Sequence, residues 1–214
     1  MKKITYFLLF TLASIHLSAQ VFWTEDFETD GETVRYTSSS VFNDGTNDHY
    51  GRTNGSNISG GYVSPNGSWF MAGEDLDDNG GDGSALKTTE FASQNISGMT
   101  DIRFSGLFAQ GTSGAGGLDG SDYLELSYRI DGGAWVLFMR FTGVSGGSNV
   151  GWAEDTNLDG TGDGVALSNT FASYLEDISV SGTTIEIRVV ASANSASEEF
   201  AYDFFQLDDI SGAG

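Results

Sequence analysis

The chain has 214 residues, of which 30 are acidic and 9 are basic, so its formal net charge at pH 7 is −21. A charge of this sign repels nucleic-acid phosphates and anionic membrane surfaces, which argues against both as direct partners. The absence of cysteine excludes disulfides, thiolate metal sites and a cysteine nucleophile.

Residues 1–19 have the pattern of a secretory signal peptide. Two lysines precede a mostly apolar stretch over residues 4–15, and the small residues Ser18 and Ala19 provide a cleavage point. This segment is too short to span a membrane, and no later stretch is long and apolar enough to be inserted into one. We therefore expect a secreted, extracellular or cell-surface protein with a single module over residues 20–214, whose net charge without the two lysines is −23.

Short runs that alternate apolar and polar residues predict an all-β fold. The clearest unit is a hairpin, in which the turn Asp131-Gly132-Gly133 joins residues 123–130 to residues 135–141. The other expected strands are residues 21–27, 68–72, 84–91, 102–109, 165–171, 184–191 and 201–207. No long segment keeps the apolar period of a helix. The pattern indicates an antiparallel two-sheet β-sandwich of the jelly-roll type.

The acidic, glycine-rich segment 74–83 contains the pattern D-x-[DN]-x-[DN]-G. Calcium loops of EF-hands begin in this way, because oxygen side chains at places 1, 3 and 5 converge on one hard cation and a glycine at place 6 turns the backbone. Leu86 stands where an EF-hand has its last glutamate, so the loop is not an EF-hand. We expect it to bind Ca²⁺ through the following residues: Asp75, Asp77, Asn79 and Asp82.

A second segment with the same pattern lies over residues 154–164, and Ala166 stands in place of its last glutamate. The expected calcium ligands are the side chains of Asp155, Asn157, Asp159 and Asp163 and the carbonyl of Thr161. The alternative for both segments is a solvated turn, which Asn, Asp and Gly form without any ion.

Aromatic side chains offer a platform on which sugar rings could stack. The candidates are Trp152, Trp69 and Tyr62, with Trp135 and Phe70 as further members of the group. Trp152 follows a glycine and precedes an acidic loop, so we expect it to be the most exposed of them. The alternative is that alternation places these rings in the core of the sandwich.

Catalytic motifs are scarce. After removal of the signal peptide, His49 is the single histidine, and the chain contains no G-x-S-x-G motif and no P-loop lysine. A pair of carboxylates could still hydrolyse glycosidic bonds, because that chemistry needs only two acids at a set separation. We therefore assign no catalytic residue and leave enzymatic activity open.

Three motifs carry a family resemblance. The opening W-x-E-D-F-E (residues 23–28), the middle F-x-A-G-E-D-x-D-D (residues 70–78) and the closing L-D-D-I (residues 207–210) resemble jelly-roll modules of large secreted bacterial proteins, notably of Bacteroidetes. Those modules are similar to calcium-binding carbohydrate-binding modules and to MAM or laminin-G-like domains. The resemblance implies that Glu28 on the first strand and Asp209 on the last share a structural calcium ion.

The sequence thus favours a secreted, calcium-stabilised binding or adhesion module. Its expected partners are an extracellular glycan and neighbouring domains of a longer chain. Two alternatives remain open at this stage: a structural spacer that binds nothing, and a carboxylate-based glycan hydrolase or lyase.

Overall fold

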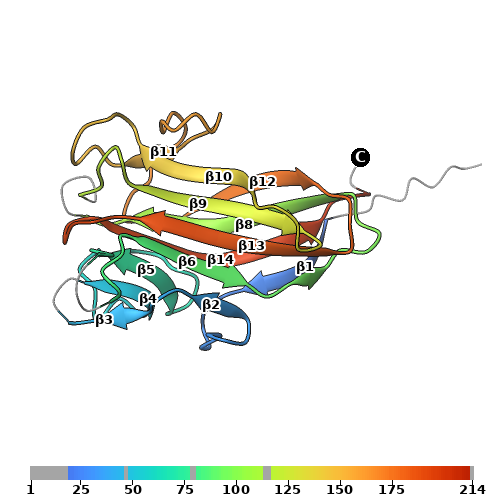
Figure 1. Cartoon of the computed structure of the whole chain (residues 1–214), viewed down its shortest axis with the longest axis horizontal. Helices are drawn as coiled ribbons and strands as arrows, with labels where there is room; N and C mark the ends of the chain where they lie inside the picture. The colour runs from blue at the N-terminus through green and yellow to red at the C-terminus, as the bar shows by residue number, and fades with distance from the viewer. Residues whose placement is uncertain (1–18, 46–47, 78–80, 113–116, 213–214) are drawn as a thin grey trace, which may run out of the picture.

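The computed structural model describes residues 19–45, 48–77, 81–112 and 117–212. Its strands form two antiparallel sheets that pack face to face (Figure 1), so the predicted all-β sandwich is confirmed. The described part of the chain contains no helix that is long and apolar enough to cross a membrane. Residues 1–18 of the predicted signal peptide lie outside the described residues.

Sheet A has seven strands in the order β12-β8-β14-β5-β4-β3, with β1 also paired to β14. Because β14 is long, β5 pairs with its first half and β1 with its second half. The strands are β1 (Gln20–Glu25), β3 (Phe42–Asn43), β4 (His49–Thr53), β5 (Phe70–Glu74), β8 (Asp101–Gln110), β12 (Ala172–Ser179) and β14 (Glu199–Asp209).

Sheet B has seven strands in the order β11-β10-β9-β13-β6-β2, with β7 also paired to β13. The strands are β2 (Tyr36–Ser38), β6 (Leu86–Phe91), β7 (Gln94–Asn95), β9 (Tyr123–Ile130), β10 (Val136–Gly143), β11 (Trp152–Glu154) and β13 (Thr184–Ser192). The predicted hairpin of β9 and β10 is present and contains a bulge between Leu137 and Met139.

An aromatic core fills the space between the sheets. Phe205 lies near its centre and contacts the rings of Phe27, Phe104 and Phe108, with centroid distances of 5.1 to 6.1 Å. A second apolar cluster lies on the opposite, outer face of sheet A, where Ile58 and Tyr62 of the β4–β5 connection pack over it. Its buried members are Phe70, Ala72, Ala109, Phe171 and Ala201. Sheet A is therefore covered on both faces.

One predicted strand is wrong, and six observed strands were not predicted. Residues 165–171 make only isolated bridges, through Ala166 and Thr170, because the chain crosses there from sheet B to sheet A. The strands that were not predicted are the short β2, β3, β7 and β11 and the longer β4 and β12. The described ends of the chain lie together, since Gln20 pairs with Asp209, whereas the acidic loops lie at the opposite end of the sandwich (Figure 1).

Candidate functional site

The starts of β4 and β14 and the ends of β5 and β11 lie at the loop end of the sandwich (Figure 1). Acidic residues occupy the chain at or next to these strand ends. Several are almost completely buried: Asp48, Glu74, Asp122, Asp155, Glu198 and Glu199. Buried carboxylates are costly unless hydrogen bonds or positive charge compensate them. A cation bound at this end would therefore stabilise the folded state more than one bound elsewhere.

The loop after β11 is organised around the carboxylate of Asp155, which is 1% exposed. Its Oδ1 accepts a hydrogen bond from the N–H of Asp159 (3.0 Å), and its Oδ2 accepts one from the N–H of Gly160 (2.8 Å). Asn157 Oδ1 accepts from the same Asp159 N–H at 3.0 Å. Side-chain oxygens of the first two expected ligands therefore converge on one backbone amide.

These residues fit calcium in their chemistry, because oxygen is the ligand atom that calcium prefers. The described residues contain no group of three or more His, Asp or Glu side chains that could hold a metal ion by themselves. An ion in this loop therefore needs the amide oxygen of Asn157, backbone carbonyls such as that of Thr161, or water as further ligands. Asp163 faces Thr156, whose N–H and hydroxyl both donate to it, and these bonds lower the pKa of Asp163.

The first acidic loop is arranged differently. Asp75 has a positive φ of 47° and turns its carboxyl group toward Asp48 of the β3–β4 turn and toward Asp77. Burial and these two neighbours raise the pKa of Asp75 to about 7. Asn79 lies outside the described residues. Asp82 forms an ion pair with the fully buried Lys87.

The implied pairing of Glu28 with Asp209 is not present. The β1–β14 register places Asp209 opposite Gln20, at the far end of β1 from Glu28. Glu28 Oε1 instead accepts hydrogen bonds from the N–H groups of Ser68 (2.7 Å) and Trp69 (2.8 Å), which lower its pKa. Asp209 accepts from the N–H of Ser211. Glu28 and Asp209 therefore lie apart, and each carboxylate has its own hydrogen-bond partners.

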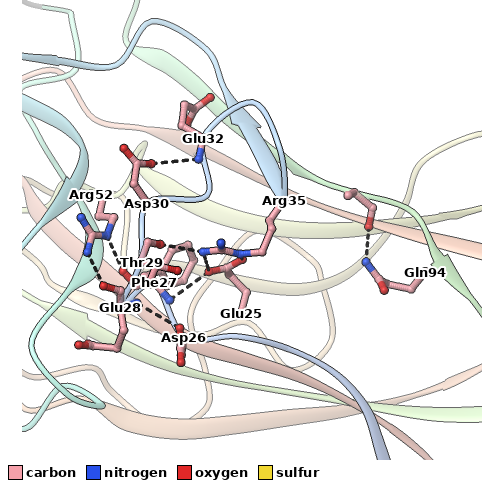
Figure 2. Close-up of polar contacts among 11 residues, drawn as sticks. Glu25, Asp26, Phe27, Glu28, Thr29, Asp30, Glu32, Arg35, Arg52 and Gln94 are labelled. Carbon is pink, nitrogen blue, oxygen red and sulfur yellow. Dashed lines mark hydrogen bonds and ion pairs between the residues drawn. The ribbon is translucent and has the colours of Figure 1, made fainter.

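The segment around Glu28 is held by arginines (Figure 2). Arg35 Nε donates to the buried Glu25 at 2.7 Å, and another nitrogen of its guanidinium donates to the carbonyl of Thr29 at 2.7 Å. Arg52 donates to the carbonyls of Phe27 and Glu28. These bonds fix the backbone that leaves β1 and positions the Glu28 carboxylate.

Glu74 and Glu199 form a buried pair that the sequence analysis missed. They lie directly opposite each other on β5 and β14, and both are 0% exposed. Burial raises the pKa of Glu74 to about 7, and the neighbouring Glu199 adds to the rise. An acid that ends the otherwise apolar run Phe70–Glu74 was the available sequence signal; its partner could be found only from the strand register.

The expectation that Trp152 is exposed is wrong. Trp152 is 1% exposed, and its ring stacks on Phe200 of the other sheet with centroids 5.7 Å apart. Tyr62 packs against Phe70 and Phe171 over the outer face of sheet A. Trp69 lies beneath Arg52, whose guanidinium carbon is 3.9 Å from the ring centre. These three rings therefore do not form one sugar-stacking platform.

Trp135 lies on the outer face of sheet B with two arginines. The guanidinium carbons of Arg129 and Arg188 are 4.5 and 4.4 Å from its ring centre. Arg129 forms an ion pair with Glu186, whereas Arg188 has no ion pair among the described residues and its buried Nε has no hydrogen-bond partner there. Successive side chains of a strand point to opposite faces of the sheet. Because Ile187 and Val189 face the core, Arg188 between them points to the outer face of sheet B.

A hollow of about 300 Å³ lies beside this arginine–tryptophan row, at the edge of sheet B formed by β2 and β6. Glu186 and Glu90 line it, and Glu90 is directly opposite Arg188 in the β6–β13 ladder. Thr37 and the edge of the mostly buried Tyr36 also line the hollow. The acceptors Glu90 and Glu186, the donor Arg188 and the ring of Trp135 are thus neighbours on this surface.

His49 is not placed as a catalytic base. It is 3% exposed, its Nε2 lies 3.1 Å from the carbonyl oxygen of Gly51, and its Nδ1 has no partner among the described residues. Burial lowers the pKa of His49, so the ring is neutral at pH 7.

No family model matches this chain, and no curated protein matches it. The solved structures with similar folds include the K3 cleaved adhesin domain of Lys-gingipain from Porphyromonas gingivalis (10% identity, 87% of this chain and 98% of that chain, TM-score 0.49). They also include the CBM22-1 xylan-binding domain from Paenibacillus barcinonensis (12%, 89% and 94%, 0.42) and a family 35 carbohydrate-binding module from Clostridium thermocellum (14%, 86% and 96%, 0.41). At such low identities and TM-scores, what this chain binds has to be inferred from its own residues.

Proposed function

We propose that the chain is a secreted, calcium-stabilised binding module that recognises a glycan on the outer face of sheet B. The predicted signal peptide supports export, and the oxygen-rich loop around Asp155 supports the calcium ion. Two proteins with similar folds are themselves binding modules, one an adhesin domain and the other a xylan-binding domain.

The observation that carries the glycan site is the hollow beside Trp135 and Arg188. Its volume of about 300 Å³ is at the lower end of the range of small-ligand pockets. Carboxylates of Glu90 and Glu186 in the lining can accept hydrogen bonds from sugar hydroxyls. Arg188 is opposite Glu90 in the β6–β13 ladder, next to the lining residues, and its unpaired guanidinium can donate hydrogen bonds to the same ligand. The ring of Trp135 adds apolar surface next to these polar groups.

A glycan array probed with the purified chain, with calcium and with chelator, tests this function. Arg188→Ala should weaken binding to any hit by about tenfold or more, because it removes charge-assisted hydrogen bonds worth about 1.5 kcal/mol or more. Arg103→Ala is the matched control, since Arg103 lies on sheet A and is paired with Asp177. An empty array, or hits that Arg188→Ala leaves unchanged, would contradict the proposal.

A further inference from the structure

We propose that Glu74, Glu199 and Ser59 form a buried site for a hard divalent cation of the calcium type, beneath the β4–β5 connection on the outer face of sheet A. None of the ligands expected from the two acidic loops belongs to it. The site is independent of the glycan surface and of the loop around Asp155.

Two like charges lie next to each other at this position of sheet A. Glu199 is directly opposite Glu74 in the β14–β5 ladder, so both side chains leave the sheet on the same face. Neither is exposed, and no Lys or Arg among the described residues forms an ion pair with either of them. Like charges in direct opposition destabilise a sheet, and burial increases that cost.

The hydroxyl of Ser59 contacts both carboxylates. Ser59 Oγ lies 2.5 Å from Glu74 Oε1 and also within hydrogen-bond distance of Glu199 Oε1. A serine hydroxyl has a single proton, so it can donate to only one of the two. The other oxygen–oxygen contact requires either a proton on a carboxyl group or a cation.

Buried oxygens without partners near this pair favour a cation over a shared proton. Glu199 Oε2 is buried and has no hydrogen-bond partner among the described residues. It faces the backbone of Gly111, where an added Cβ would lie 1.7 Å from it. The hydroxyl of Tyr62, three residues after Ser59, is also buried without a partner. One proton satisfies one contact, whereas calcium accepts six to eight oxygens and can bind both carboxylates and the Ser59 hydroxyl together.

An ion at this position would join three segments. Glu74 ends β5, Glu199 begins β14, and Ser59 belongs to the connection that covers the outer face of sheet A. The ion would therefore fasten this connection to the sheet, next to the apolar contacts that Tyr62 makes with Phe70 and Phe171.

Calcium titration calorimetry on the chelator-stripped chain tests the proposal. Glu199→Gln should remove one bound ion, or weaken one site by at least tenfold, and Ser59→Ala should weaken the same site. The matched control is Glu176→Gln, the same change at a half-exposed position of the edge strand β12, which should leave the ion count unchanged. Asp155→Ala should remove a different ion, so failure of the loop site and failure of this site are distinguishable.

A crystal structure grown with calcium or Tb³⁺ provides the second measurement and needs no variant. The proposal requires an anomalous peak within about 2.3–2.6 Å of oxygens of both Glu74 and Glu199. The absence of that peak overturns it. A Glu199→Gln variant that melts higher in chelator and binds calcium as the wild type does also overturns it, since those results identify a shared proton.

Discussion

Trp152 of β11 stacks on Phe200 of β14 with an interplanar angle of 29°, and this contact joins sheet B to sheet A directly below the acidic loop. The backbone N–H of Trp152 also donates to Gln110 Oε1 of β8 at 2.8 Å. The residue expected to contact a ligand therefore anchors the base of the loop that carries Asp155.

Trp152→Ala should lower the free energy of unfolding by about 3–5 kcal/mol, because it leaves a large cavity between the sheets. Trp135→Ala, on the outer face of sheet B, should cost much less. Urea denaturation of both variants measures the difference. Similar losses for the two variants would show that Trp152 does not have the structural role described for it.

The buried Lys87 should make Asp82 a stability residue rather than a metal ligand. Asp82→Asn should destabilise the fold, because it leaves the ammonium group of Lys87 buried without a paired charge. Lys87→Met removes that charge, and in this background Asp82→Asn should have little further effect. Thermal melts of the double-mutant cycle test the coupling. A large additional loss in the Lys87→Met background, confined to calcium-containing buffer, would instead identify Asp82 as a ligand.

Glu198 predicts a pH dependence of stability in chelator. Burial is the main cause that raises its pKa to about 7, and the nearby Asp122 contributes. The folded state then holds a proton that the unfolded state has released, so stability is greatest below about pH 4.5 and falls as the pH rises to about 7. Each such group contributes a slope of at most about 1.4 kcal/mol per pH unit.

Glu198→Gln should reduce this slope. Part of the slope should remain, because the pKa values of Glu74, Asp75 and Asp203 are also raised to about 7. Chemical denaturation at several pH values between 4 and 8 measures the change. A wild-type stability that rises over this range would contradict the assignment.

Alternation of apolar and polar residues predicted the strands that have one buried and one exposed face. Residues 123–130 alternate strictly and end in an Asp-Gly turn, and β9 has those bounds. In β4 alternation is hidden, because the β4–β5 connection covers the outer face of sheet A and buries four of the five residues in His49–Thr53. The edge strand β12 was missed for the opposite reason: most of its side chains are exposed or half-exposed.

The candidate sites depended on long-range register, which the sequence does not display. The Asp155 loop could be recognised, since all its expected ligands lie within nine residues of one another. Glu74 and Glu199 are distant in the sequence and meet only because β5 and β14 are neighbours. Arg188 and Trp135 meet through the order of β10, β9 and β13 in sheet B.

Calcium-dependent melting tests the central claim most directly. An ion that binds the folded state alone stabilises it by about 2.7 kcal/mol at a hundredfold excess over Kd, which corresponds to a rise in Tm of about 5–10 °C for a chain of this size. The wild type and Asp177→Asn, a control on the surface of sheet A, should both show this rise between chelator and millimolar calcium, and Asp155→Ala should lose much of it. Superimposable wild-type melting curves in chelator and in calcium would contradict the account.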